Sequence, residues 1–276
     1  GILSAFREAG FYTAFISNQP GNHSYVDFFA MQGDEHHPIR KELRRKKRRL
    51  YDSDMLPYLQ RLLASEHPKL LVVLHTYGSH FSYRDRYPKE EAFFPVKGHY
   101  SGSERDSLNL RNAYDNAVRQ TDKFVSSVIH LLEGGDRMAS LLYISDHGED
   151  VYDDERERFL HSSPDVSYYQ LHVPLLIWSD KRWREAHPKL FAAGKANSGK
   201  PISSNSVFHT LLELAGVCTS YRRDDLSVVN AHFRGGQRFY LNDRYECVPI
   251  EDLELPEEDV RIFREKGLYL PPSSLE

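Results

Sequence analysis

The segment ASLLYISDHGE spans Ala139–Glu149 and joins an apolar run to a polar cluster. Its first part, Ala139–Ser145, has the length and composition of a buried strand. A second run, Lys69–His75 (KLLVVLH), has the same character, and a third covers Val173–Trp178 (VPLLIW). Continuous apolar strands are typical of a sheet that is covered on both faces. These three runs therefore predict a central sheet that lies between layers of helices.

Helical patterns alternate with these strands along the chain. Apolar residues at i, i+3 and i+4 spacing predict a long helix over Arg105–Leu132, and a further strand is expected at Tyr12–Ser17. Shorter helices are expected at Ser4–Ala9, Asp54–Ser65 and Ser204–Ala215. Strands interleaved with helices predict an α/β fold, a three-layer α/β/α sandwich with a mainly parallel central sheet.

The composition is that of an ordinary globular protein. The 276 residues include 36 basic and 40 acidic side chains, so the net charge is −4 with neutral histidines. No global positive charge indicates a nucleic-acid partner, and no apolar run approaches the ~20 residues that span a bilayer. We expect a single domain over 1–276, with 218–276 as a peripheral C-terminal part. The two cysteines, Cys218 and Cys247, are compatible with either a disulfide or two thiols.

Polar clusters follow the predicted strands where ligands bind in open α/β sheets, outside the carboxyl ends of the strands. Asp146 and His147 come directly after one strand, and Gly148 permits a turn that brings both side chains together. An Asp oxygen and a His nitrogen suit Zn²⁺. The alternative is a helix-capping Asp beside a surface His. Because His80 and His161 lie in loops expected at the same edge, we favour the metal site.

A set of motifs carries a family resemblance. The chain resembles the periplasmic catalytic domain of bacterial phosphoethanolamine transferases of the lipid A or lipooligosaccharide type, in the sulfatase and alkaline-phosphatase superfamily. The order and spacing of the motifs match over roughly residues 1–217. The matching segments are LHTYGSH (Leu74–His80), YDN (Tyr114–Asn116), SDHGE (Ser145–Glu149), LH (Leu160-His161) and HVPLLIW (His172–Trp178).

The resemblance implies an alkaline-phosphatase-like fold and a zinc-dependent transfer of phosphoethanolamine. The donor would be phosphatidylethanolamine and the acceptor lipid A or a related glycolipid, at the periplasmic face of the bacterial inner membrane. The transfer would pass through a covalent phospho-threonine. By motif, Asp146 and His147 would hold one catalytic zinc ion. His80 and His161 would act as acid and base, bind the phosphoryl group or reach a second ion, and Ser79 would join the substrate-binding set.

The chain departs from the family pattern at its beginning. The family's threonine nucleophile and a glutamate metal ligand precede the helix that matches Ser4–Ala9, so both are expected upstream of Gly1, with the first sheet strand and the membrane anchor. Neither Thr13 nor Thr76 matches the nucleophile motif. We therefore expect this chain alone to bind zinc weakly and to be inactive. The alternatives are a sulfatase or phosphoglycerol transferase of the same superfamily, or a non-catalytic domain.

A basic run covers Arg40–Arg49 (RKELRRKKRR), with eight basic residues in ten. Such a run is compatible with a solvated helix or loop. It is also compatible with a patch that contacts an anionic membrane surface, where each Lys or Arg contributes about 1 kcal/mol. No aromatic spacing accompanies it that would favour a nucleic acid.

Overall fold

The computed structural model divides the chain into two compact units, Gly1–Arg137 and Met138–Glu276. They are called unit 1 and unit 2, and each is described by itself. Within the described residues, no helix is long and apolar enough to cross a membrane. The structure describes residues 1–19, 25–43, 48–97, 107–161, 166–235, 237–242, 244–253 and 255–266.

Unit 1 is built on a three-stranded parallel sheet in the order β2-β1-β3. The central strand β1 (Tyr12–Ser17) pairs with β2 (Glu35–Pro38) on one side and with β3 (Leu70–His75) on the other. In the register of β1 and β3, Ser17 lies opposite His75, so both strands end at the same edge of the sheet. The sequence predicted a parallel sheet and strands at Tyr12–Ser17 and Lys69–His75, and the structure of unit 1 confirms them.

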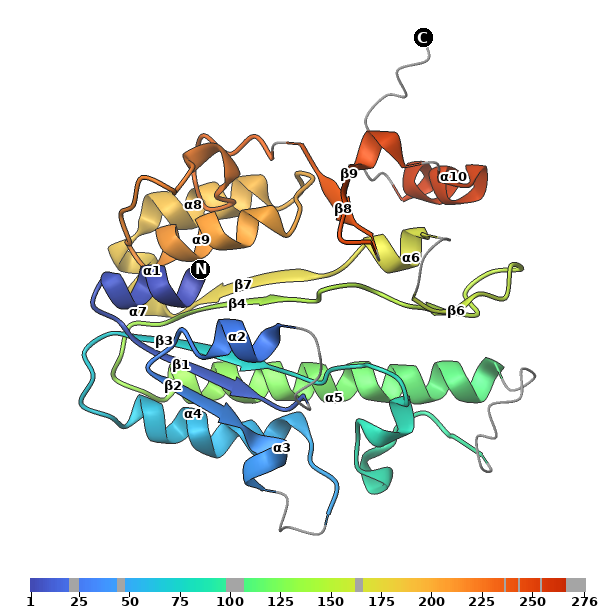
Figure 1. The fold of residues 1–276 in the computed structure, drawn as a ribbon, viewed down its shortest axis with the longest axis horizontal. Helices are drawn as coiled ribbons and strands as arrows, with labels where there is room; N and C mark the ends of the chain where they lie inside the picture. Colours follow the sequence, from blue (N-terminus) through green and yellow to red (C-terminus); the bar gives the residue numbers. More distant parts are fainter. Residues whose placement is uncertain are drawn as a thin grey trace. The chain divides into compact units, whose positions relative to one another are not determined.

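The helices of unit 1 cover both faces of this sheet. The chain moves from β1 to β2 through α2 (Val26–Ala30), then returns across β1 to β3 through α3 (Ile39–Glu42), η1 (Asp52–Met55) and α4 (Leu56–Leu63). Right-handed crossovers in opposite directions place their helices on opposite faces. Figure 1 shows α1 (Ile2–Glu8) and α2 on one side of the sheet, with α4 and α5 (Ser107–Glu133) on the other. Two short 3₁₀ turns, η2 (Tyr83–Asp85) and η3 (Lys89–Glu91), follow β3.

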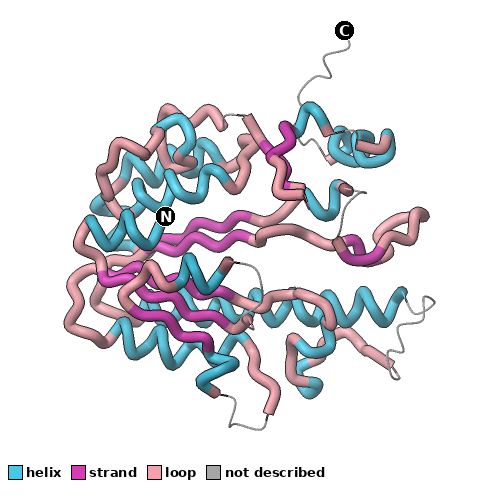
Figure 2. The backbone as a smooth tube through the Cα atoms, in the orientation of Figure 1, coloured by secondary structure: helices cyan, strands magenta, loops and turns pink. Residues whose placement is uncertain are grey.

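Unit 2 contains an antiparallel pair, which differs from the expected mainly parallel arrangement. Strand β4 (Ser140–Ile144) pairs with β7 (Leu175–Ser179), and the two strands lie side by side in Figure 2. In their register, Ile144 lies opposite Leu175. Between them lie the hairpin of β5 (Asp150–Val151) and β6 (Phe159–Leu160) and the short helix α6 (Tyr168–Leu171). A parallel return needs a crossover to the start of β4. This connection contains no such crossover, so β7 runs back from the end where β4 stops.

The rest of unit 2 packs around Trp183 and the residues that follow α9. Helices α7 (Lys181–Ala186), α8 (Pro188–Asn197) and α9 (Asn205–Leu214) precede η4 (Asp224–Leu226). Elements β8 (Phe239–Leu241), β9 (Cys247–Pro249), η5 (Ile250–Asp252) and α10 (Glu257–Glu265) complete the unit. One core cluster consists of Trp183, Leu214, Val228, Val229 and Phe233. Part of the segment expected to be peripheral is therefore buried. Both cysteines are exposed thiols.

Candidate metal centre

The end of β4 carries the histidine that the sequence analysis singled out. Ser145 Oγ donates to the carbonyl oxygen of His147 at 2.7 Å and holds the turn after the strand. His147 Nδ1 lies 2.9 Å from the carbonyl oxygen of Gly148, which can only accept. Nδ1 therefore carries the proton, and Nε2 is left with its lone pair for a ligand.

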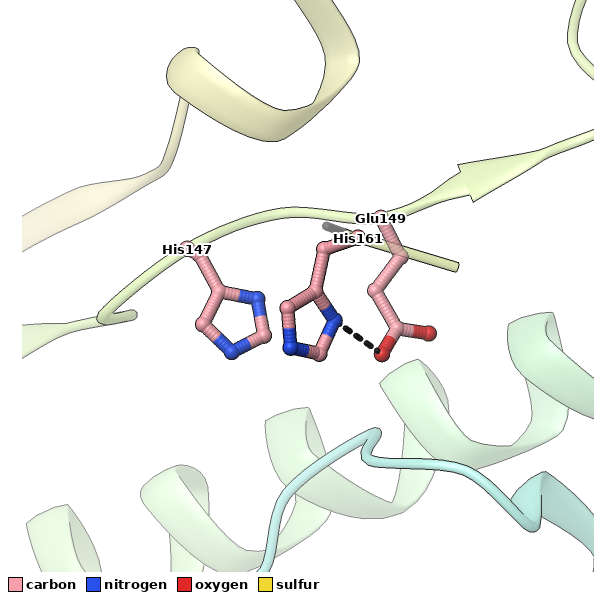
Figure 3. A group of neighbouring side chains, drawn as sticks. All are labelled: His147, Glu149 and His161. Carbon is pink, nitrogen blue, oxygen red and sulfur yellow. Dashed lines mark hydrogen bonds and ion pairs between the residues drawn. The ribbon is translucent and has the colours of Figure 1, made fainter. Parts of the chain in front are cut away.

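Three side chains come together beside this turn. His147, Glu149 and His161 each offer a nitrogen or oxygen atom, and these atoms all lie within 4.8 Å of one another. His161 Nδ1 is 3.2 Å from Glu149 Oε1, and the ring centroids of the two histidines are 3.7 Å apart. Figure 3 shows the two rings side by side, with the Glu149 carboxylate next to His161. We call this group the histidine–glutamate cluster.

The donors of this cluster fit a zinc ion. Zinc takes His nitrogen and carboxylate oxygen at about 2.0–2.2 Å, so two ligands of a tetrahedral ion lie roughly 3.3–3.6 Å from each other. The separation of His161 Nδ1 and Glu149 Oε1, 3.2 Å, is close to that value, and without a metal the same two atoms form a hydrogen bond. Glu149 is buried while His147 and His161 are half-buried, so the cluster is anchored on one side and accessible on the other.

Asp146 lies next to this cluster and is open to solvent. Its side chain is 82% exposed, and its Oδ2 is 3.8 Å from His147 Nε2. Its other oxygen, Oδ1, accepts the backbone N–H of His147 at 3.1 Å. Asp146 thus reaches the same nitrogen of His147 that the hydrogen bond to Gly148 leaves for a ligand.

Helix α6 explains why a glycine separates His147 from Glu149. Gly148 N donates to the carbonyl oxygen of Gln170 at 2.9 Å, and a Cβ atom at Gly148 would lie 2.0 Å from the carbonyl oxygen of Tyr169. Asp150, on the other side of Glu149, accepts from Ser167 Oγ at 2.9 Å and from Gln170 Nε2 at 2.6 Å. Both neighbours of Glu149 are therefore held by the same helix.

His80 and Ser79 lie in unit 1, in the loop after β3. Asp52 holds this loop, since Oδ1 accepts from Tyr77 N at 2.8 Å and Oδ2 from Gly78 N at 3.0 Å. Arg86 Nε donates to the carbonyl oxygen of His80 at 2.7 Å. His80 is exposed and Ser79 is half-buried. Of the predicted site residues, the structure brings together His147 and His161, with Asp146 beside His147.

The predicted basic surface is described only in part, because Arg44–Lys47 lie outside the described residues. Arg48 pairs with Asp54, and Arg49 Nη1 lies 2.7 Å from Asp85 Oδ1. Arg40 donates from Nε to the carbonyl oxygen of Asn18 at 2.5 Å, and its guanidinium lies 4.5 Å from the ring centroid of Tyr77. Each of these three arginines thus has a partner within unit 1.

Comparison with known proteins shows which family this chain belongs to. The sulfatase family model matches residues 1–217. The chain belongs to the sulfatase family. That match includes both the loop that carries His80 and the complete histidine–glutamate cluster, and it confirms the superfamily and the alkaline-phosphatase-like fold expected from the motifs.

Several similar proteins are named phosphoethanolamine transferases. Phosphoethanolamine transferase EptC of Escherichia coli O18:K1:H7 is 28% identical over 247 residues, which are 87% of this chain and 42% of the relative. Kdo(2)-lipid A phosphoethanolamine 7''-transferase of Salmonella typhimurium is 30% identical over 196 residues, 69% of this chain and 34% of the relative. The chain spans less than half the length of these two relatives.

A solved structure resembles the chain over most of its length. The C-terminal periplasmic domain of EptC from Escherichia coli, in complex with zinc, has a TM-score of 0.79 and 26% identity. The likeness covers 90% of this chain and 71% of that one. A relative that binds zinc is thus known with the same fold.

Glu149 is a member of the cluster that was not among the site residues predicted from the sequence. It was part of the SDHGE motif, two positions after His147. Residues i and i+2 of an extended backbone lie on the same side. That spacing was the signal that would have added Glu149 to the predicted site.

Proposed function

We propose that this chain is the catalytic part of a zinc-dependent phosphoethanolamine transferase. It acts on phosphatidylethanolamine as donor and on lipid A or a related glycolipid as acceptor, at the periplasmic face of the bacterial inner membrane. The phosphoethanolamine group is first bonded to a threonine hydroxyl with release of diacylglycerol, and the acceptor hydroxyl then displaces that threonine. By motif, this chain does not supply the threonine. The observation that carries the proposal is the convergence of His147, Glu149 and His161 after β4.

The residues divide the work by their geometry. His147 offers Nε2 and Asp146 offers its exposed carboxylate, so these two hold the metal. Zinc, when bound, polarises a phosphoryl oxygen as a Lewis acid. Glu149 accepts a hydrogen bond from His161 Nδ1, which fixes the ring that contacts the phosphoryl group or transfers a proton. By motif alone, His80 and Ser79 of the loop after β3 are assigned to binding of the same group.

The relatives support the choice of a lipid A acceptor. One is named for transfer of phosphoethanolamine to Kdo(2)-lipid A, and the zinc complex is a periplasmic domain. The basic run Arg40–Arg49 suits an anionic lipid surface. Changing Arg44, Arg45, Lys46 and Lys47 to Ser is therefore expected to weaken sedimentation of the chain with anionic vesicles, and unchanged sedimentation contradicts this role.

Zinc and ligand binding test the proposal directly. Isothermal titration of the metal-free chain with zinc is expected to show one weak site that is lost in His147→Ala and Asp146→Ala. The zinc-loaded chain is then titrated with phosphoethanolamine, glycerol phosphate and sulfate. We expect phosphoethanolamine to bind most tightly. A preference for sulfate supports the sulfatase alternative, and a preference for glycerol phosphate the phosphoglycerol transferase. Undiminished zinc binding in both variants contradicts the assigned site.

A further inference from the structure

The C-terminal helix α10 contains a carboxylate that is completely removed from solvent. Asp259 is 0% exposed and lies beyond residue 217, where the family match ends. Buried carboxylates are rare unless they are paired and hydrogen-bonded. The burial of Asp259 therefore indicates that this side chain has specific hydrogen-bonding partners in unit 2.

Asp259 binds two arginines from the turn of the β5–β6 hairpin. Its Oδ2 lies 2.6 Å from Arg156 Nη1 and 3.0 Å from Arg158 Nη2. Arg156 also pairs with Asp154 in the same turn, and Arg158 Nε lies 4.0 Å from Asp150 Oδ1. The carboxylate thus closes a network that spans the whole hairpin.

The same carboxylate also holds the first turn of α6. Asp259 Oδ1 accepts the backbone N–H of Tyr168 at 2.9 Å. Beside this bond, Ile262 and Phe263 of α10 pack with Tyr168 in one apolar cluster. Figure 1 shows α10 next to α6. One buried side chain therefore connects the hairpin to the helix.

Both elements bound by Asp259 lead directly into the histidine–glutamate cluster. The hairpin joins Glu149, immediately before β5, to His161, immediately after β6. Helix α6 fixes Gly148 between His147 and Glu149. A shift of the hairpin relative to α6 would move Glu149 and His161 away from His147.

We propose that Asp259 is a positioning residue for the metal centre, which holds the β5–β6 hairpin against α6 so that Glu149 and His161 meet His147. This inference rests on the proposed function, because it concerns the same site. Carboxylates that orient metal-binding histidines typically contribute about 10- to 100-fold to metal affinity. Asp259 acts one step further out, through the hairpin that carries both Glu149 and His161.

The test compares Asp259→Asn with a matched variant of the same helix. Glu265→Gln also breaks an ion pair of α10, since Glu265 Oε1 lies 2.9 Å from Arg261 Nη1, but this pair is exposed. Arg158→Gln changes the network from the hairpin side. It leaves Asp259 paired with Arg156 and leaves no arginine of the turn without a carboxylate. All three are made in the full chain.

Hydrogen exchange of the metal-free chain is the first readout. In Asp259→Asn we expect at least tenfold faster exchange across residues 148–160, with Leu70–His75 unchanged as an internal reference. Arg158→Gln is expected to accelerate hydrogen exchange in the same region by a smaller factor. Glu265→Gln is expected to leave the exchange rate there within twofold of that in the unmodified chain. An unchanged hairpin in Asp259→Asn overturns the inference. So does faster exchange of equal size in Leu70–His75, because it indicates general unfolding.

Zinc affinity is the second readout and separates this inference from the proposed function. We expect zinc to bind Asp259→Asn about 10- to 100-fold more weakly than the unmodified chain, and Glu265→Gln as tightly. Equal affinity in Asp259→Asn and the unmodified chain overturns the inference and leaves the proposed function intact. If the unmodified chain takes up no zinc, the proposed function fails, and the exchange experiment alone decides whether Asp259 holds the hairpin.

Discussion

Gly148 and Tyr169 approach each other so closely that no side chain fits between them. A Cβ atom at position 148 would lie 2.0 Å from the carbonyl oxygen of Tyr169. The two segments cannot move apart easily. The Tyr169 oxygen belongs to the backbone of α6, and Gly148 N donates a hydrogen bond to the carbonyl oxygen of the following residue, Gln170. The contact sets the path of the chain between His147 and Glu149.

Gly148→Ala is therefore expected to displace the cluster. Relief of the clash requires a backbone shift, for which overpacking typically costs about 1–3 kcal/mol. We expect at least tenfold weaker zinc binding by calorimetry, together with a lower free energy of unfolding in urea. The control is Gly199→Ala, where an added Cβ meets nothing within 4 Å. Unchanged zinc affinity in Gly148→Ala would show that the site tolerates a different chain path.

Substitution of the cluster residues separates metal ligands from orienting groups. His147→Ala and Asp146→Ala are expected to abolish measurable zinc binding. Glu149→Gln and His161→Ala should weaken it about 10- to 100-fold, because the His161 ring packs on the ring of His147 and Glu149 holds His161, so both orient a ligand rather than bind the ion. His130→Ala, an exposed histidine of α5, serves as the control. Zinc binding that survives in Asp146→Ala but vanishes in Glu149→Gln would instead make Glu149 the carboxylate ligand.

The apolar strands were predictable because a strand that is buried on both faces has a continuous run of apolar residues in the sequence. The runs at Lys69–His75 and Ala139–Ser145 match β3 and β4 within one residue at each end. The direction of pairing was not predictable, since an apolar run such as Val173–Trp178 has the same composition in either orientation. Strand β2 was not expected either, because its sequence Glu35–Pro38 (EHHP) is polar and ends in proline.

The site was predictable where neighbours in sequence are neighbours in space. His147 and the motif around it follow a strand, which made them visible as candidates. Asp259 was not, because its partners Arg156 and Arg158 lie about a hundred positions away, and the acidic residues of Glu257–Asp259 resemble a solvated surface. Only the fold shows that one carboxylate of that group is buried.

The loop that carries His80 is expected to depend on Asp52. This carboxylate accepts the N–H groups of Tyr77 and Gly78 and a third bond from Asn18 Nδ2 at 2.8 Å. Asp52→Asn places a donor where an acceptor is needed, and an unsatisfied buried polar group costs about 1–3 kcal/mol.

Hydrogen exchange at Tyr77 and Gly78 measures this effect, and we expect it to accelerate in Asp52→Asn. Asp85→Asn is the control. It breaks the pair with Arg49, whose two side chains are 46% and 42% exposed, and exposed pairs contribute at most about 1 kcal/mol. Equal acceleration in both variants would mean that the loop is not held by Asp52.

Acid should weaken the network around Asp259. Burial by itself would raise the pKa of Asp259, but hydrogen bonds from Arg156, Tyr168 and Arg158 hold it below the ordinary value of 3.8. A carboxylate whose pKa is lowered in the folded state adds stability above its unfolded pKa and loses it as the pH falls through the folded pKa. The contribution of Asp259 is therefore complete near neutral pH, begins to fall near the ordinary pKa of 3.8 and is lost as the pH passes through the lower pKa of the folded state.

Urea unfolding at a series of pH values between 7 and 3 tests this expectation. The difference in free energy of unfolding between the unmodified chain and Asp259→Asn should be largest at pH 7 and should shrink below the ordinary pKa of 3.8. Asp154 keeps some acid sensitivity in the variant, because its hydrogen bond with Arg156 also lowers its pKa. A difference that stays constant down to pH 3 would show that the charge of Asp259 does not stabilise the fold.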